Sequence, residues 1–215
     1  MTDPTAAPVA TDLPVPPERI LARVVAVDPE AAALVGRVPA DVTLHPLDFY
    51  AGAAHARVVA WLPTGPVAFP FVYHIADDPA SDRAHPLGTP ERVLAANAAE
   101  GFRLSPEQAV AYLRFYLEVT EPAGRAGRRL VAHADEVPWL AKTLTDPGLR
   151  VARERAAQRV HGARVEHAGG GLRVTATTLR GRVVRVVTWH VAEDGRVAEE
   201  RASTVFEGAP VVEVL

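Results

Sequence analysis

Three segments near the C-terminus alternate apolar and polar residues with a period of two, and short glycine-containing turns join them. The segments are residues 172–179, 182–191 and 196–206, with Arg180-Gly181 and Asp194-Gly195 between them. A period of two places successive side chains on opposite faces of a strand, and Asp-Gly is a strong signal for a hairpin turn. The pattern therefore predicts an antiparallel meander, with residues 163–167 as a candidate fourth strand.

Turns of two residues fix the register of this meander, because strand pairs can be counted back from each turn. One face of the sheet is then apolar and should lie on the core. Two charged residues, Arg185 and Glu200, fall on that face. The expected neighbours are Ala176 and Thr204 on either side of Arg185, with Thr178 nearby, and Trp189 opposite Glu200.

A charge on a core face must be paired, hydrogen-bonded or placed beside a cavity, because desolvating it alone is costly. One hypothesis is a pocket in which Arg185 receives an anionic group, lined also by Glu200, Trp189, Thr178 and Thr204. Three structural explanations stay open. Arg185 pairs with a carboxylate from a helix, it reaches past the sheet edge into water, or a bulge changes the register.

The first half of the chain contains a second hairpin signal. Residues 56–62 and 67–75 are rich in β-branched and aromatic residues, and a Pro-Thr-Gly-Pro turn separates them. Pro70 restricts its strand to a sheet edge or a bulge, because proline donates no backbone hydrogen bond. A loop is expected over residues 77–88, and residues 130–133 are a candidate short strand.

Helices are predicted mainly from their caps and stop signals. Residues 17–27 fit a short helix or a strand. Helices are expected from Asp28-Pro29 to Leu34, from Thr89-Pro90 to Glu100, from Ser105 to Glu121 and from Asp146-Pro147 to about Val160. Of these, the segment after Ser105 has the clearest start, since Ser105 and Gln108 form a capping-box pattern.

These elements predict an α+β fold in which capped helices and an N-terminal β-hairpin region accompany a C-terminal antiparallel meander. As architecture only, this resembles the helix-on-curved-sheet domains of cystatin-like or NTF2-like type, which host many unrelated functions. Residues 1–17 hold five prolines and are expected to form a flexible arm. Residues 18–215 are expected to form a single domain, with a possible subdivision into 18–122 and 123–215.

Composition excludes several classes of protein. The absence of cysteine rules out disulfides, thiolate zinc sites and cysteine nucleophiles. No apolar run is long enough to span a bilayer and no signal peptide opens the chain, so we expect a cytoplasmic protein without membrane association. Of 23 basic residues only Lys142 is a lysine, which indicates a GC-rich bacterial genome and weakens any argument from arginine clusters.

The chain shows no strong signature of catalysis. None of the 8 histidines has metal-binding spacing, so we expect no metal and no cofactor. His74 with Asp77 and Asp78 is the closest grouping suited to acid–base chemistry, although such residues are also ordinary at a turn. His45, His55, His85, His133 and His190 are isolated in sequence. The run of Gly169, Gly170 and Gly171 precedes a strand and lacks the lysine of a phosphate-binding loop.

Three functions remain, and the favoured one is a non-catalytic binding or assembly protein that contacts another protein or a second copy of itself. The alternative is a small-molecule binder or a cofactor-free isomerase, cyclase or hydrolase with an anionic ligand at Arg185. The third is a nucleic-acid-associated protein that uses the segment from Arg150 to Arg164; the net charge of -3 makes this the least expected. The helix expected after Asp146 carries Arg150, Arg153, Arg155 and Arg159 on its expected outer face, a pattern also typical of a solvated helix.

Overall fold

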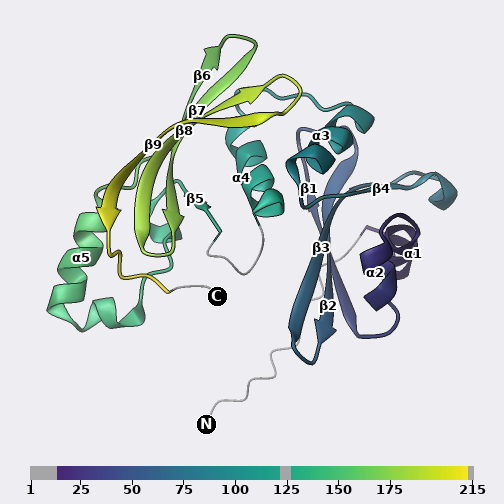
Figure 1. Ribbon diagram of the computed structural model, residues 1–215, viewed down its shortest axis with the longest axis horizontal. Helices are drawn as coiled ribbons and strands as arrows, with labels where there is room; N and C mark the ends of the chain where they lie inside the picture. The colour runs from purple at the N-terminus through teal and green to yellow at the C-terminus, as the bar shows by residue number, and fades with distance from the viewer. Residues whose placement is uncertain (1–13, 122–126, 213–215) are drawn as a thin grey trace. The chain divides into compact units, whose positions relative to one another are not determined.

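The computed structural model describes residues 14–121 and 127–212. They form an α+β fold with five α-helices and two antiparallel sheets, of four and five strands (Figure 1). The predicted fold class is therefore confirmed. The predicted arm lies largely outside the described residues, as do residues 124–126 of the turn expected between residues 124 and 129.

The described residues divide into two compact units. The first unit contains the described residues up to Leu47 and the range Gly52–Pro86. The second unit contains Asp48–Ala51 and the described residues from Leu87 onward. Each unit contains its own sheet. The expectation of a single domain with a subdivision at residue 122 stays a prediction.

The first unit is a four-stranded meander with two helices. Its strands are β1 (Ala40–Pro46), β2 (Ala53–Leu62), β3 (Gly65–His74) and β4 (Arg83–Pro86), in that order, and its helices are α1 (Pro17–Val27) and α2 (Pro29–Leu34). The predicted hairpin is β2–β3, whereas β1 and β4 were not expected. β4 pairs only with Phe71–His74, so Pro70 has a strand partner on one side alone, as its missing amide requires.

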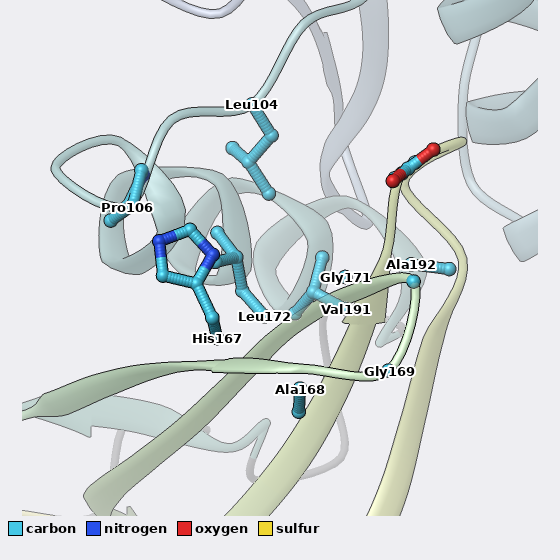
Figure 2. A pocket seen from close by; sticks show the side chains of 11 residues that line it. Leu104, Pro106, His167, Ala168, Gly169, Gly171, Leu172, Val191 and Ala192 are labelled. Atoms are coloured by element: carbon cyan, nitrogen blue, oxygen red, sulfur yellow. The ribbon is translucent and has the colours of Figure 1, made fainter.

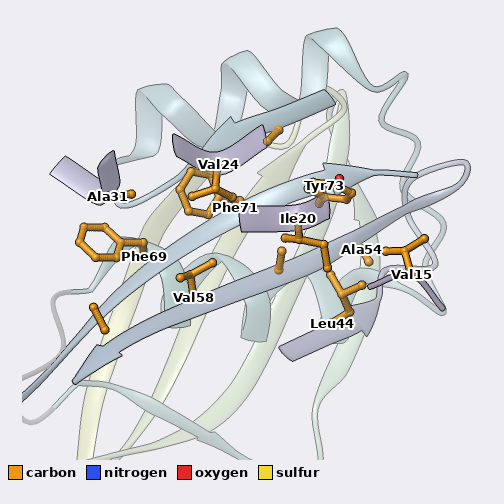
Figure 3. Close-up of a cluster of buried hydrophobic side chains, with 13 residues drawn as sticks. Val15, Ile20, Val24, Ala31, Leu44, Ala54, Val58, Phe69, Phe71 and Tyr73 are labelled. Carbon is orange, nitrogen blue, oxygen red and sulfur yellow. The ribbon is translucent and has the colours of Figure 1, made fainter. Parts of the chain in front are cut away.

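One face of this sheet forms the core of the first unit together with α1 and α2 (Figure 3). Ile20 and Val24 lie one turn apart on α1 and are fully buried against it. Ala56 and Val58 come from alternate positions of β2, as a period of two requires. The carboxylate of Asp28 accepts the amides of Glu30 and Ala31 and starts α2 as predicted.

A buried ion pair fastens α1 to the strands of the first unit. Asp82 is 1% exposed, and both of its carboxylate oxygens accept hydrogen bonds of 2.7 Å from the Arg19 guanidinium. The Tyr73 hydroxyl donates to the same carboxylate at 2.6 Å, and the Ala76 amide donates at 2.9 Å. These four donors satisfy a charge that would otherwise be costly to bury.

The second unit contains the five-stranded sheet. The path is β5 (Arg129–Val131), β7 (Gly171–Arg180), β8 (Val183–Ala192) and β9 (Val197–Glu207), and β6 (Arg164–Ala168) also pairs with β7. The predicted meander and its fourth strand are confirmed, and the segment after residue 129 supplies a further short strand. Its α-helices are α3 (Pro90–Ala99), α4 (Ala109–Thr120) and α5 (Pro147–Ala157).

The helix caps of the second unit follow the sequence signals with one difference. Thr89 and Asp146 cap α3 and α5 with their side chains, as expected. Only half of the capping box before α4 forms: the Ser105 amide donates to Gln108 Oε1 at 3.1 Å, and the helix begins later, at Ala109. Short 3-10 turns are Pro79–Ser81 in the first unit, and Ala134–Glu136 and Ala141–Leu144 in the second.

The register of the meander differs from the expected one in the first hairpin. The turn residues are Gly181 and Arg182, so Ala176 pairs with Val187 and Thr178 pairs with Arg185. The shift is by an even number of residues, so the two faces keep their composition. In the second hairpin the expected pairing holds only from Arg185 to Thr188, because a β-bulge lies at each end of that stretch.

Both faces of this sheet carry packed side chains. α4 packs against β5 and β7, and the fully or nearly fully buried residues on the odd-numbered positions of β8 are Val187, Trp189 and Val191. On the other face, Leu179 and Val184 belong to a separate apolar cluster with Ala156 of α5. The second unit is thus a sheet with helices on both faces rather than on one.

Candidate functional site

The expected anion site is a row of three residues across the C-terminal sheet. Thr178 of β7 pairs with Arg185 of β8, which pairs with Thr204 of β9. Directly paired residues of antiparallel strands point to the same face, so the three side chains share the face that carries Trp189. The sequence predicted this face and these three residues, although it placed Ala176 rather than Thr178 opposite Arg185.

Arg185 is half-buried, and its guanidinium has few partners. Its Nε donates a hydrogen bond of 3.3 Å to Thr204 Oγ1. In the described parts of the chain, no ion pair joins Arg185 to a carboxylate. The bulge between Val184 and Arg185 leaves Arg185 opposite its expected partner Thr204, and the hydrogen bond between the two side chains is exposed. Pairing of Arg185 with a helix carboxylate is not observed among the described residues.

Thr178 lies beside this arginine with an unsatisfied polar atom. Its side chain is 0% exposed, and its Oγ1 has no hydrogen-bond partner among the residues that the structure describes. Most buried hydroxyls in native proteins are paired, so a buried orphan calls for an explanation. A ligand polar group beside Arg185 is one such explanation.

Glu200 does not belong to this site, contrary to the sequence-based expectation. The bulge between Thr188 and Trp189 makes Glu199, not Glu200, the partner of Trp189. The extra residue turns the Glu200 side chain to the exposed face, where its Oε2 accepts a hydrogen bond of 2.9 Å from Arg173 Nε. Trp189 remains 1% exposed in the core.

A hollow of about 400 Å³ lies at the other end of the same sheet, where the β6–β7 and β8–β9 turns meet the loop before α4 (Figure 2). Its lining side chains are mostly apolar, and two of them, His167 and Glu193, are polar. The residues that line it are Leu104, Pro106, His167, Ala168, Gly169, Gly170, Gly171, Leu172, Val191, Ala192 and Glu193.

Sequence reasoning did not find this hollow, because its residues come from three separate stretches of the chain. The run of Gly169, Gly170 and Gly171, which carries no phosphate-binding signature in the sequence, forms one wall of the hollow. Gly171 has a packing role there: a Cβ at this position would lie 2.2 Å from the Val191 carbonyl oxygen. The glycine therefore lets β7 and β8 approach closely beside the hollow.

The candidate acid–base group around His74 shows turn geometry. Asp78 accepts hydrogen bonds from the Ala80 amide at 3.1 Å and from Ser81 Oγ at 3.0 Å, and so caps the 3-10 turn that follows. Asp77 is exposed. The alternative explanation given by the sequence, strand-exit turn chemistry, accounts for Asp78; the acid–base role of the group stays untested.

Three histidines that are isolated in the sequence lie in one row of the first unit's sheet. His45 pairs with His55 across β1 and β2, with ring centroids 6.3 Å apart, and His85 of β4 lies in the same row beyond Val72. Burial, and then the neighbouring His45 and Arg57, lower the pKa of His55 to about 4. No group of three metal-ligating side chains occurs within residues 14–121 and 127–212.

The arginines of α5 divide between two environments. Arg153 lies over the ring of Trp139, 5.6 Å from its centroid, in a cation–π contact. Arg150, Arg155 and Arg159 are exposed. Arg153 was expected on the outer face with them, and its contact with Trp139 instead links α5 to the segment before it.

Comparisons with known proteins supply no family for this chain. No protein-family model matches it, and neither the search of curated proteins nor the search of solved structures gave a significant match. Within the described ranges, no helix is both long and apolar enough to cross a lipid bilayer.

Proposed function

We propose that this is a binding protein whose second unit holds a small anionic ligand beside Arg185. The observation that carries the proposal is the pairing of a half-buried arginine, without a carboxylate partner among the described residues, with the buried and unsatisfied hydroxyl of Thr178. Both groups would gain partners from one carboxylate or phosphate group.

The row offers suitable donors for such a group. A guanidinium has five N–H donors, and the hydrogen bond from Nε to Thr204 uses one of them. The Thr178 hydroxyl can donate to an anionic oxygen or accept from a protonated one. The guanidinium and the threonine hydroxyls serve here as hydrogen-bonding groups, so the row supports binding rather than general acid–base catalysis.

A titration of the full chain with inorganic phosphate and with acetate, at constant ionic strength, tests the proposal. We expect saturable shifts of the Arg185 Nε–H signal in NMR spectra of the wild type, and their loss in Arg185→Met. Arg201→Met is the matched control, because Arg201 is an exposed arginine of the same sheet whose partner is Thr188 on the opposite face. The proposal would be overturned if both variants responded equally to the anions. It would also be overturned if the wild type showed no anion response while Arg185→Met lost stability.

If the wild type binds the anions as expected, native mass spectrometry of protein purified from its own source would identify the ligand.

Association through β9 is the second candidate function. Residues Ala198 to Thr204 are exposed throughout, and the outer edge of β9 has no strand partner in the described chain. An unpaired edge is a template for a second strand, although the two bulges and the adjacent Glu199, Glu200 and Arg201 are features that limit such pairing. Sedimentation velocity over a range of concentrations tests it: Ser203→Pro should lower the self-association of the wild type, and a wild type that stays monomeric excludes pairing between copies.

A further inference from the structure

We infer that the hollow beside the β6–β7 turn binds a primary ammonium group carried on a short apolar body. This site is separate from the Arg185 row and goes beyond the function proposed above. Its volume of about 400 Å³ lies within the usual range for small-molecule sites.

The apolar part of the ligand would contact side chains from two strands and one loop. Leu172 and Val191 are buried residues of β7 and β8 that line the hollow. Leu104 and Pro106, from the loop before α4, line it from another side (Figure 2). Leu104 and Pro106 are only half-buried, so contact with a hydrocarbon body would remove their apolar area from water, while Leu172 and Val191 form the buried wall behind it.

The polar part of the hollow favours a cation. The lining residues include the carboxylate of Glu193 and no arginine or lysine. In the described chain, the Glu193 side chain has no ion pair and no hydrogen bond, so its charge is available to a ligand. An anionic ligand would be repelled by the Glu193 carboxylate. His167 is the only lining side chain that could donate a hydrogen bond to such a ligand.

A second carboxylate lies close to the His167 side of the hollow. The Ser105 hydroxyl, its own backbone amide and, to a smaller extent, His167 lower the pKa of Glu107, which keeps this carboxylate ionised at neutral pH. The local charge near the hollow is therefore negative at two places. This arrangement attracts ammonium ions and repels carboxylates of the same shape.

The backbone fixes the position of Glu193 at this site. Its amide donates to the Gly170 carbonyl oxygen at 3.3 Å, which ties the end of β8 to the β6–β7 turn. The following turn is held by side chains of α3 and α4, since Asn97 Nδ2 donates to the Asp194 carbonyl oxygen at 2.9 Å. Because the backbone around Glu193 is already held in place, less conformational entropy is lost when its carboxylate binds a ligand.

NMR titration of the full chain with three probes that each carry a phenyl ring on a short chain tests the inference. The probes are phenethylamine, 2-phenylethanol and 3-phenylpropionate, at neutral pH and constant ionic strength. We expect saturable amide shifts at residues 169–171 and 193 with the amine, a weaker response to the alcohol, and none to the carboxylate. In Glu193→Gln, amine affinity should fall by about two- to fivefold, as for an exposed ion pair, while alcohol affinity stays unchanged.

Glu207→Gln is the matched control, because Glu207 is an exposed glutamate at the opposite end of the sheet, paired with Val183. It should leave the affinity for the amine unchanged. A preference for the alcohol or the carboxylate over the amine, or equal effects of the two glutamate substitutions, would overturn the inference. A comparison of phenethylamine with Nα-acetyl-lysine methylamide distinguishes two sources of the ammonium group. Tighter binding of phenethylamine indicates a free amine as the ligand, and tighter binding of the lysine derivative indicates a lysine side chain.

Discussion

The Tyr112 hydroxyl of α4 donates a hydrogen bond of 2.6 Å to the carbonyl oxygen of Gly195, 83 residues further along the chain. The same hydroxyl accepts from Asn97 Nδ2 at 3.0 Å, and Asn97 Oδ1 accepts from the Tyr50 hydroxyl. The β8–β9 turn is thus held by a chain of buried side-chain groups. These hydrogen bonds fix the end of β8, where Glu193 lines the hollow.

Gly195→Ala should destabilise the protein by about 2–4 kcal/mol. The glycine has a φ of +84°, and a Cβ there would lie 2.1 Å from Asn97 Nδ2 and 2.4 Å from the Tyr112 hydroxyl. Gly181→Ala is the control, because that glycine also has a positive φ, of +53°, but has no atom within 4 Å of its Cβ position. It should cost only the backbone term of about 1–2 kcal/mol. Urea unfolding of both variants measures the difference, and equal losses would show that the contacts around Gly195 are unimportant.

Tyr112→Phe should lower the free energy of unfolding by about 1–3 kcal/mol, because it leaves the Gly195 carbonyl without the tyrosine hydroxyl and removes one of the two acceptors of Asn97 Nδ2. Tyr116→Phe is the comparison, since Tyr116 lies on the same helix and is also buried, with no hydrogen bond from its hydroxyl in the described chain. Thermal unfolding of the two variants gives the contrast. A Tyr116 variant as unstable as the Tyr112 variant would contradict the role of the Gly195 bond.

Thr178→Val should raise the free energy of unfolding by about 1 kcal/mol and weaken phosphate binding. Valine has nearly the same shape and removes a buried hydroxyl that has no partner among the described residues. Thr177→Val is the adjacent control and should destabilise, because the Thr177 hydroxyl donates to the His161 carbonyl oxygen and accepts from the His161 amide, each at 3.0 Å. A destabilised Thr178 variant would mean that its hydroxyl has a structural partner, and would remove one support of the anion site.

Acid should unfold the first unit by protonating Asp82. Hydrogen bonds from Arg19, and then from Tyr73 and Ala76, hold the pKa of this carboxyl well below its usual range. A folded pKa below the unfolded value of about 3.9 means that the stabilisation is complete above that value and is lost as the pH falls through and below it. NMR signals of β3, followed in urea at pH 5.5 and pH 3, should show earlier unfolding at the lower pH.

Asp82→Asn is the control for this pH dependence. The variant should be less stable at pH 5.5, because Arg19 loses its charged partner. It should also lose most of the difference between the two pH values in the signals of β3. A variant that keeps the full acid sensitivity would assign that sensitivity to other carboxyl groups.

Local signals predicted much of this fold. Asp28, Thr89 and Asp146 each start a helix with their own side chain, so a few neighbouring residues contain all the information needed. The meander was likewise predictable from alternation and turns. In contrast, β1 and β4 are recognisable mainly through their pairing with β2 and β3, which depends on residues far apart in the sequence.

The candidate site was predictable only in part. Arg185, Thr178 and Thr204 were placed on the correct face because alternation alone decides the face. The position of Glu200 was wrong because a bulge adds one residue, and nothing in the local sequence required it. His167 and Glu193 were not predicted to line one hollow, since they meet only through the pairing of β7 with β6 and β8.

The boundary between the two units is not a single point on the chain. Asp48–Ala51 lies between β1 and β2 of the first unit but belongs to the second. There the Phe49 ring packs edge-on against Tyr112, with centroids 5.1 Å apart. No single truncation or fusion point can therefore yield both units complete. During synthesis, Phe49 and Tyr50 leave the ribosome before Asn97 and Tyr112 exist, and the second unit acquires its full set of aromatic contacts only when a later part of the chain reaches back to an earlier one.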